Sequence, residues 1–90
     1  MTETPLIHIA SLVIRARPEA VPTVTRLIES WSEAEIAASD PAGRLVVVLE
    51  TDLEARIFDV IDTLTPQVLA VNLVYHQIES AETLDEEINP

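Results

Sequence analysis

The sequence predicts one α+β domain in which four strands and two helices follow the order βαββαβ. Three observations lead to this fold. Short runs rich in Val, Ile and Leu, which are typical of strands, alternate with two segments whose apolar residues recur every three or four positions, as in a helix. The length of 90 residues suits a single domain. Two βαβ halves of this order form a four-stranded antiparallel sheet with both helices on one face.

The first part of the chain predicts a strand and then a helix. Residues 6–15 are rich in Ile, Val and Leu, and Pro18 disfavours a helical conformation for the residue before it, so the strand should end there. Pro22 fits a helix only in the first turn, where backbone N–H groups have no helical acceptor. The apolar residues with helical spacing are Val21, Val24, Leu27, Ile28 and Trp31.

The middle of the chain predicts a hairpin. Residues 34–38 form a weak strand, because alanine and glutamate have low strand propensity. Residues 44–50 contain an unbroken aliphatic run and form a stronger one. Between them Asp40, Pro41 and Gly43 stand in the order that a type I turn prefers. The two strands should therefore pair.

The last third predicts a helix, a strand and a tail. Thr51 and Glu54 have the spacing of a capping box, in which each side chain binds a free backbone N–H. Residues 69–78 form the last strand and end a domain predicted to span residues 1–78. Residues 79–90 contain five acids and no base, and we expect them to be disordered. The buried stripe of the helix is predicted to be Leu53, Ile57, Val60, Ile61 and Leu64, with Thr65-Pro66 ending it.

Composition excludes several kinds of partner and chemistry. Five basic residues, all arginine, oppose 16 acids and give a net charge of −11, so nucleic acid and anionic lipid should be repelled and a cationic partner favoured. No cysteine is present, which excludes disulfides and thiolate metal sites. With one glycine and no base–acid arrangement beside Ser11, neither a phosphate-binding loop nor a nucleophile is expected. We therefore expect that the protein is not an enzyme and that it binds no cofactor.

The beginning of the sequence predicts neither a signal peptide nor a membrane span. An acid, Glu3, stands where a secretory signal carries positive charge, and His8 and Ser11 interrupt the apolar stretch that follows. We expect the protein to stay in the cytoplasm.

One face of the predicted sheet has no helix to cover it. If each strand alternates regularly, the helix-covered side receives Leu12, Ile14, Ile36, Ala38, Leu45, Val47, Leu49, Val71, Leu73 and Tyr75. The opposite parity places on the uncovered side Ile9, Ser11, Val13, Ala37, Val46, Val48, Val74 and His76, with Glu35, Glu50 and Asn72. His8 and His76 are then on opposite faces and cannot meet at one metal ion, so no metal site is predicted.

Four valines break the apolar-in, polar-out alternation expected of a sheet with one solvated face. They are Val13, Val46, Val48 and Val74. Three explanations stay open: isolated exposed residues with high strand propensity, a dimer interface, or a groove for a partner peptide.

Several segments resemble the NapD family, whose members are assembly chaperones of the periplasmic nitrate reductase. The segments are Ser11-Leu12-Val13, Ser39-Asp40, residues 43–50 and Leu73-Val74-Tyr75-His76-Gln77, and the resemblance runs from about residue 7 to residue 79. It implies a ferredoxin-like fold whose sheet binds the twin-arginine signal peptide of the reductase's catalytic subunit. It also implies a cytoplasmic protein that holds the precursor back from export while its molybdenum cofactor is inserted. The family's peptide docks as a helix against the sheet, and the corresponding segments here would be Ser11-Leu12-Val13, Val74-Tyr75-His76 and the strand after Gly43.

The residues and the resemblance agree on one hypothesis. An aliphatic face with an acidic rim complements a peptide that begins with arginines and continues with apolar residues. We expect the valines to contact the apolar part, Glu35 or Glu50 to attract the arginines, and the protein to act as a monomer. The predicted peptide-binding residues are Ser11, Val13, Glu35, Val46, Val48, Glu50, Val74 and His76.

Other functions of the same topology fit less well. The alternative is a small dimeric regulatory domain that binds a small effector, but the sequence has no glycine-rich or polar loop at a strand–helix junction. A metallochaperone would need cysteine. An RNA-binding sheet needs basic charge and stacking aromatics, and none of the three aromatic residues is predicted on the uncovered face.

Overall fold

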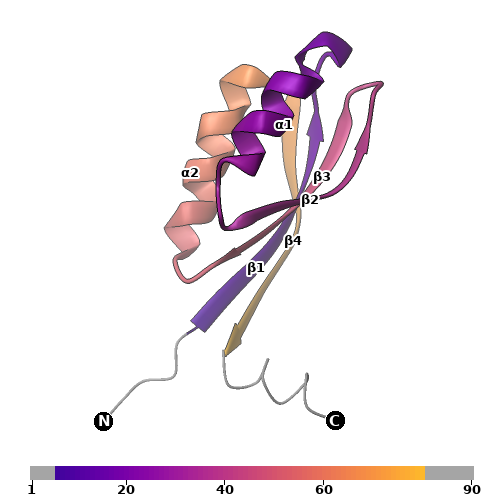
Figure 1. Ribbon diagram of the computed structural model, residues 1–90. Coiled ribbons are helices and arrows are strands. Elements are labelled where there is room, and N and C mark those ends of the chain that lie inside the picture. Colours follow the sequence, from indigo (N-terminus) through magenta and orange to yellow (C-terminus); the bar gives the residue numbers. More distant parts are fainter. Residues whose placement is uncertain (1–5, 81–90) are drawn as a thin grey trace, which may run out of the picture.

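The protein folds as a four-stranded antiparallel sheet with both helices on the same side (Figure 1). This computed structural model describes residues 6–80. The strands are β1 (Leu6–Arg15), β2 (Ala34–Asp40), β3 (Arg44–Thr51) and β4 (Ala70–Ser80), in the spatial order β2-β3-β1-β4. The helices are α1 (Val21–Glu29) and α2 (Glu54–Leu64), with 3₁₀ turns η1 (Pro18–Ala20) before α1 and η2 (Thr65–Gln67) after α2. The predicted ferredoxin-like fold is confirmed.

The hydrophobic core lies between the helices and one face of the sheet. Alternate residues of β1 and β3 are fully buried, and Val24, Ile28, Ile57, Val60 and Leu64 meet them from the helices. Pro22 stands in the first turn of α1, as predicted. The buried strand residues are Ala10, Leu12, Ile14, Leu45, Val47 and Leu49.

Strand β4 continues past the predicted end of the domain. Glu79 and Ser80 pair with Ile7 and Leu6 of β1, so the strand ends two residues later than residue 78. The remainder of the predicted acidic tail, residues 81–90, lies outside the described residues.

The turn between β2 and β3 has the predicted chemistry. The Gly43 N–H donates to the carbonyl of Asp40 at 2.9 Å, and the Ala42 N–H donates to Asp40 Oδ1 at 2.7 Å. Gly43 has a φ of 120°, which is a left-handed conformation that residues with a Cβ rarely adopt. Its carbonyl also accepts the Ala16 N–H at 2.7 Å, which joins the hairpin to the segment that follows β1.

The predicted capping box is wrong. Thr51 is the last residue of β3, and the residue at the start of α2 is Leu53, whose side chain makes no capping hydrogen bond. Thr51 Oγ1 instead accepts the Leu53 N–H at 3.2 Å, so the hydroxyl closes a local turn. Leu53 was predicted in the buried stripe but is 64% exposed, because it precedes the first helical turn.

Bulges in both edge strands change which face some side chains occupy. In β2 the register shifts between Ile36 and Ala38, so that Ala38 lies opposite Val46. Directly opposed residues point to the same face, and Val46 shares the parity of Val48 on the uncovered side. Ala38 was predicted to face the core and is exposed on the other side instead.

The bulge in β4 has a larger effect. Leu73 lies opposite Leu12 and Tyr75 opposite Ser11, which leaves Val74 as the extra residue. Tyr75 therefore points to the uncovered face, where His76 was predicted. His76 lies opposite Ala10 and belongs to the helix-covered side. Both predictions assumed a regular strand.

Replacing Gly43 by alanine tests the turn. A Cβ on Gly43 would collide with the carbonyl oxygen of Ala16 and would also strain the positive φ. We expect Gly43→Ala to lower the free energy of unfolding by about 2–3 kcal/mol, as measured by urea denaturation. Ala42→Ser, one position earlier and exposed, should change it by less than about 0.5 kcal/mol. Equal stability of Gly43→Ala and the unchanged protein would contradict this view of the turn.

Candidate functional site

The candidate site is the open face, by which we mean the sheet surface turned away from α1 and α2 (Figure 1). The strand register orders its side chains in rows that cross the sheet from β2 to β4. The central rows are Glu35–Val48–Ser11–Tyr75 and Ala38–Val46–Val13–Asn72. A further row contains Glu50, Ile9 and Gln77.

The middle of the open face is aliphatic. Val13 lies directly opposite Val46, and Val48 is two residues further along β3 on the same side. These valines are only partly buried, since no helix covers them. Tyr75 is on the other side of Ser11 from Val48 in the same row and is 46% exposed. The centre of the open face therefore offers apolar area together with one aromatic ring.

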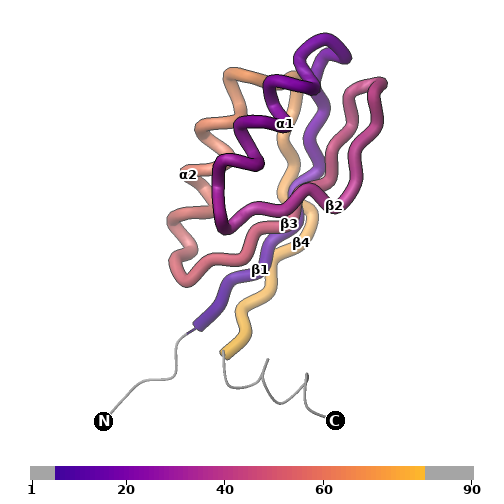
Figure 2. Tube along the Cα trace, viewed as in Figure 1, coloured from indigo at the N-terminus to yellow at the C-terminus, as the bar shows by residue number. Residues whose placement is uncertain are grey.

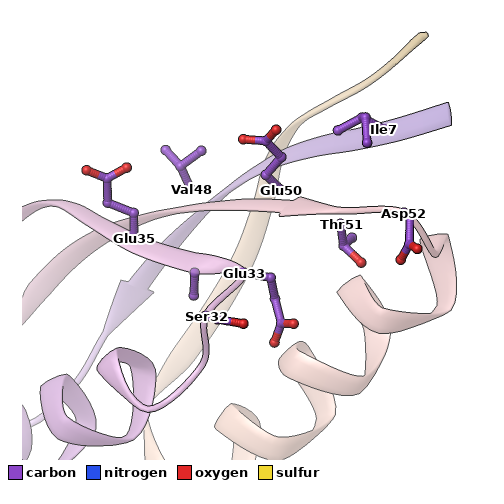
Figure 3. Close-up of a pocket in the computed structure, with 9 residues that line it drawn as sticks. Ile7, Ser32, Glu33, Glu35, Val48, Glu50, Thr51 and Asp52 are labelled. Carbon is purple, nitrogen blue, oxygen red and sulfur yellow. The ribbon is translucent and has the colours of Figure 1, made fainter. Parts of the chain in front are cut away.

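One end of the open face is acidic. A pocket of about 320 Å³ lies where β2 begins and β3 ends, and it includes Glu33, Glu35, Glu50 and Asp52 in its lining. Figure 3 shows Glu35, Val48 and Glu50 projecting to the side away from the helices, and Glu33 projecting towards them. The Glu50 N–H donates to the Glu33 carbonyl at 2.9 Å, and this hydrogen bond joins the end of β3 to the residues just before β2.

Only one of these carboxylates is neutralised by an ion pair within residues 6–80. Arg56 of α2 donates to Glu33 Oε1 from Nη2 at 2.7 Å and from Nε at 3.0 Å, and its guanidinium lies 5.7 Å from the centre of the Trp31 ring. Glu35 and Glu50 make no such pair in this part of the chain. They are exposed and leave the end of the open face with negative charge.

A comparison with protein families identifies the chain's relatives. The family model described as NapD protein matches residues 7–80. The chain belongs to the NapD family. Its relatives include Chaperone NapD of Escherichia coli K12, which is 35% identical over 75 residues, covering 80% of this chain and 86% of the relative. Chaperone NapD of Shigella flexneri matches to the same extent.

A solved NapD structure has the same architecture. The solution structure of the E. coli Tat proofreading chaperone protein NapD aligns with a TM-score of 0.68 and 33% identity, covering 83% of this chain and 82% of that one. These NapD relatives are named chaperones, which supports the prediction of a binding protein rather than an enzyme. Within residues 6–80 no helix has the length and apolarity to cross a membrane.

Most of the predicted site residues of this NapD chain lie together on the open face. The register places Ser11, Val13, Val46 and Val48 at its centre, with Glu35 and Glu50 towards the acidic end. Val74 is 59% exposed at the bulge of β4. Alternation predicted Tyr75 on the helix-covered side, because a bulge cannot be read from alternation, although the resemblance includes Tyr75 in a docking segment.

His76 lies away from the other predicted residues and contacts His8. Since His8 lies opposite Ile78 and His76 opposite Ala10, both rings are on the helix-covered side, and the predicted separation of the two histidines is wrong. His8 Nδ1 and His76 Nε2 are 3.2 Å apart, with ring centres 5.4 Å apart. This is the geometry of a hydrogen bond between β1 and β4. No group of three or more possible metal ligands occurs in residues 6–80.

Nuclear Overhauser effects test the bulge in β4 in solution. We expect the Tyr75 ring protons to give cross-peaks with Ser11, and the His76 ring protons with the methyl group of Ala10, because these residues are direct cross-strand partners. A regular β4 would instead place the Tyr75 ring on the side of the helices. Cross-peaks from Tyr75 to α2 would therefore contradict the bulge.

Proposed function

We propose that this NapD-family chain binds the twin-arginine signal peptide of the periplasmic nitrate reductase catalytic subunit on its open face. In this role the protein acts in the cytoplasm as a monomer and restrains export of the precursor until the molybdenum cofactor has been inserted. The observation that carries the proposal is that the aliphatic centre of the open face has no helix over it. The chain that has this surface is related to a Tat proofreading chaperone.

The aliphatic centre supplies the contact with the apolar part of the peptide. Val13, Val46 and Val48 are already partly buried, so a peptide that covers them gains only a fraction of the about 1.5–3 kcal/mol that full burial of an exposed side chain contributes. Association itself costs about 4–15 kcal/mol, so contact with the valines does not by itself give useful affinity. Tyr75 adds the large, rigid surface that is typical of strong contact residues.

The acidic end of the open face supplies the contact with the arginines. Glu35 and Glu50 can each accept two parallel hydrogen bonds from a guanidinium group. Because they lie next to Val48 in the register, a peptide can place its arginines on the carboxylates and its next residues on the valines. The net charge of −11 attracts the cationic peptide from a distance and repels anionic competitors.

The bulge in β4 revises the set of contact residues. Tyr75 takes the place predicted for His76, which is on the other side of the sheet. Val74 is at the edge rather than at the centre. The proposed contact surface therefore consists of Ser11, Val13, Glu35, Val46, Val48, Glu50 and Tyr75, with Val74 beside it.

Calorimetric titration with the synthetic signal peptide tests the acidic contribution. We expect one-to-one binding that weakens at least about tenfold between about 0.1 M and about 1 M salt, since the Debye length falls from about 10 Å to about 3 Å. In Glu35→Gln/Glu50→Gln the affinity should be low at both concentrations and nearly independent of salt. Asp59→Gln/Asp62→Gln, on α2, removes the same charge away from the open face and should retain the salt-dependent binding. Salt-independent binding by the unchanged protein would disprove the role of the carboxylates.

A carboxylate placed among the valines tests the aliphatic contribution. We expect Val48→Asp to reduce peptide affinity at least about tenfold, because the peptide would bury an unpaired charge. Phe58→Asp introduces the same charge at an exposed apolar residue of α2 and should bind normally. Circular dichroism should show both variants folded. Normal binding by a folded Val48→Asp would remove the open face from the proposed function.

A further inference from the structure

Strand β4 is an edge strand that lacks the features which usually keep such an edge from pairing. In the described part of the chain its one neighbouring strand is β1, so its outer side has no partner strand there. Edge strands are commonly protected by charged side chains, by proline or by being short. Strand β4 is 11 residues long, and residues 70–78 contain no charge and no proline. The other edge strand, β2, has 7 residues and carries Glu35 and Asp40.

The side chains of β4 make this edge apolar on both faces of the sheet. Leu73 and Ile78 lie on the helix-covered side, and Tyr75 lies on the open face. The end of β4 extends beyond both helices, so the helices leave Ile78 exposed (Figure 2). An apolar, uncharged edge of this length is suited to pairing with a further strand. Of the eight large hydrophobic residues that are exposed among residues 6–80, four belong to β4: Leu73, Val74, Tyr75 and Ile78.

A second copy of β4 matches this edge in an antiparallel, two-fold register. In the pairing with β1, which is regular, the bulge leaves Val74 as an extra residue. A second β4 has its own bulge at the same level, so Val74 of one copy lies opposite Tyr75 of the other and no residue is left over. On both sides of this point, partners then face the same side of the sheet. With the second residue of each pair in the second copy, these partners are Ala70–Glu79, Val71–Ile78, Asn72–Gln77 and Leu73–His76.

The charges of the two copies do not confront each other in this register. Two chains of net charge −11 repel each other in general, but residues 70–78 carry none of that charge. The two Glu79 side chains lie at opposite ends of the pair, about 30 Å apart at about 3.3 Å per residue. Each Glu79 lies beside Ala70 of the other copy, in the row that continues to Arg15. The nearest charge in that row therefore has the opposite sign.

The paired strands are long enough for a specific interface. Residues 70–79 of each copy take part, and an antiparallel ladder of this length adds about eight backbone hydrogen bonds. A typical protein–protein interface contains about ten hydrogen bonds. On the helix-covered side, the exposed Leu73 and Ile78 of each copy become covered by the side chains of the other.

We propose that the peptide-free protein pairs with a second copy of itself through β4 and that the signal peptide displaces this copy. The displacement rests on the proposed function. Val74 and Tyr75 lie at the centre of the two-fold pair, and both also belong to the surface proposed to contact the peptide. The peptide and the second copy therefore compete for these two residues, and the peptide-bound protein is a monomer.

Sedimentation velocity of the full-length protein tests the pairing. We expect a species with twice the mass of one chain, which grows with protein concentration. Ile78→Lys should weaken this dimer at least about tenfold, because it places a charged group on the edge opposite Val71 of the second copy. It should bind the signal peptide normally, since Ile78 is outside the proposed peptide-contact surface. Leu53→Lys introduces the same charge at an exposed apolar residue before α2 and should dimerise normally.

Disulfide formation tests the register, because the sequence contains no cysteine. Asn72→Cys/Gln77→Cys places cysteines opposite each other across the pair. Within one chain these two positions are about 16 Å apart, too far for an internal disulfide. We expect mild oxidation to give a covalent dimer. Asn72→Cys/Glu79→Cys, which moves one cysteine by two positions on the same face, should cross-link at least about tenfold more slowly.

The outcomes distinguish the pairing from the proposed function. A single species with the mass of one chain at every concentration would overturn the pairing and leave the proposed function intact. A dimer that persists in folded Ile78→Lys would use another surface and would also overturn the pairing. With saturating signal peptide we expect complexes of one chain and one peptide, and complexes of two chains and two peptides would overturn the competition. If neither the unchanged protein nor Ile78→Lys binds the peptide, the proposed function is removed and the competition with it.

Discussion

The structure depends on the handedness of two crossover connections. Strands β1 and β2 run parallel with β3 between them, and β3 and β4 run parallel with β1 between them. Such connections are right-handed, and the two cross the sheet in opposite senses from strands of opposite direction, so α1 and α2 lie on the same face. Residues 6–80 contain no further α-helix that could cover the other face of the sheet. The core and the open face are thus two results of one constraint.

The location of the charged residues on the open face matters in addition to the net charge of the chain. The net charge of −11 would attract any cationic partner, but it does not position one. In the proposed function, the rows of the open face set the position of the peptide, with Glu35 and Glu50 at one end and the valines in the centre. Under that proposal the surface distinguishes a peptide by the order of its charged and apolar segments as well as by its composition.

Both irregularities of the sheet occur in edge strands. A bulge leaves one residue unpaired, which β2 and β4 tolerate because each has a neighbour on one side alone. The bulge at Val74 brings Tyr75 to the open face and His76 beside His8. The same local change therefore adds an aromatic ring to the candidate site and ties the ends of β1 and β4 together.

Local chemistry in the sequence determined the order of the elements, the position of Pro22 in the first turn of α1, and the turn closed by Asp40 and Gly43. In each case the residues that decide the conformation are neighbours in the chain. Tertiary structure decided the facing of Ala38, Tyr75 and His76. Register depends on hydrogen bonds with distant strands, and the hydrophobic pattern of an edge strand constrains it weakly. Tertiary structure also decided where α2 starts. Thr51 pairs with His8 of β1 as the last residue of β3, so Thr51 is not available as the N-cap of the helix.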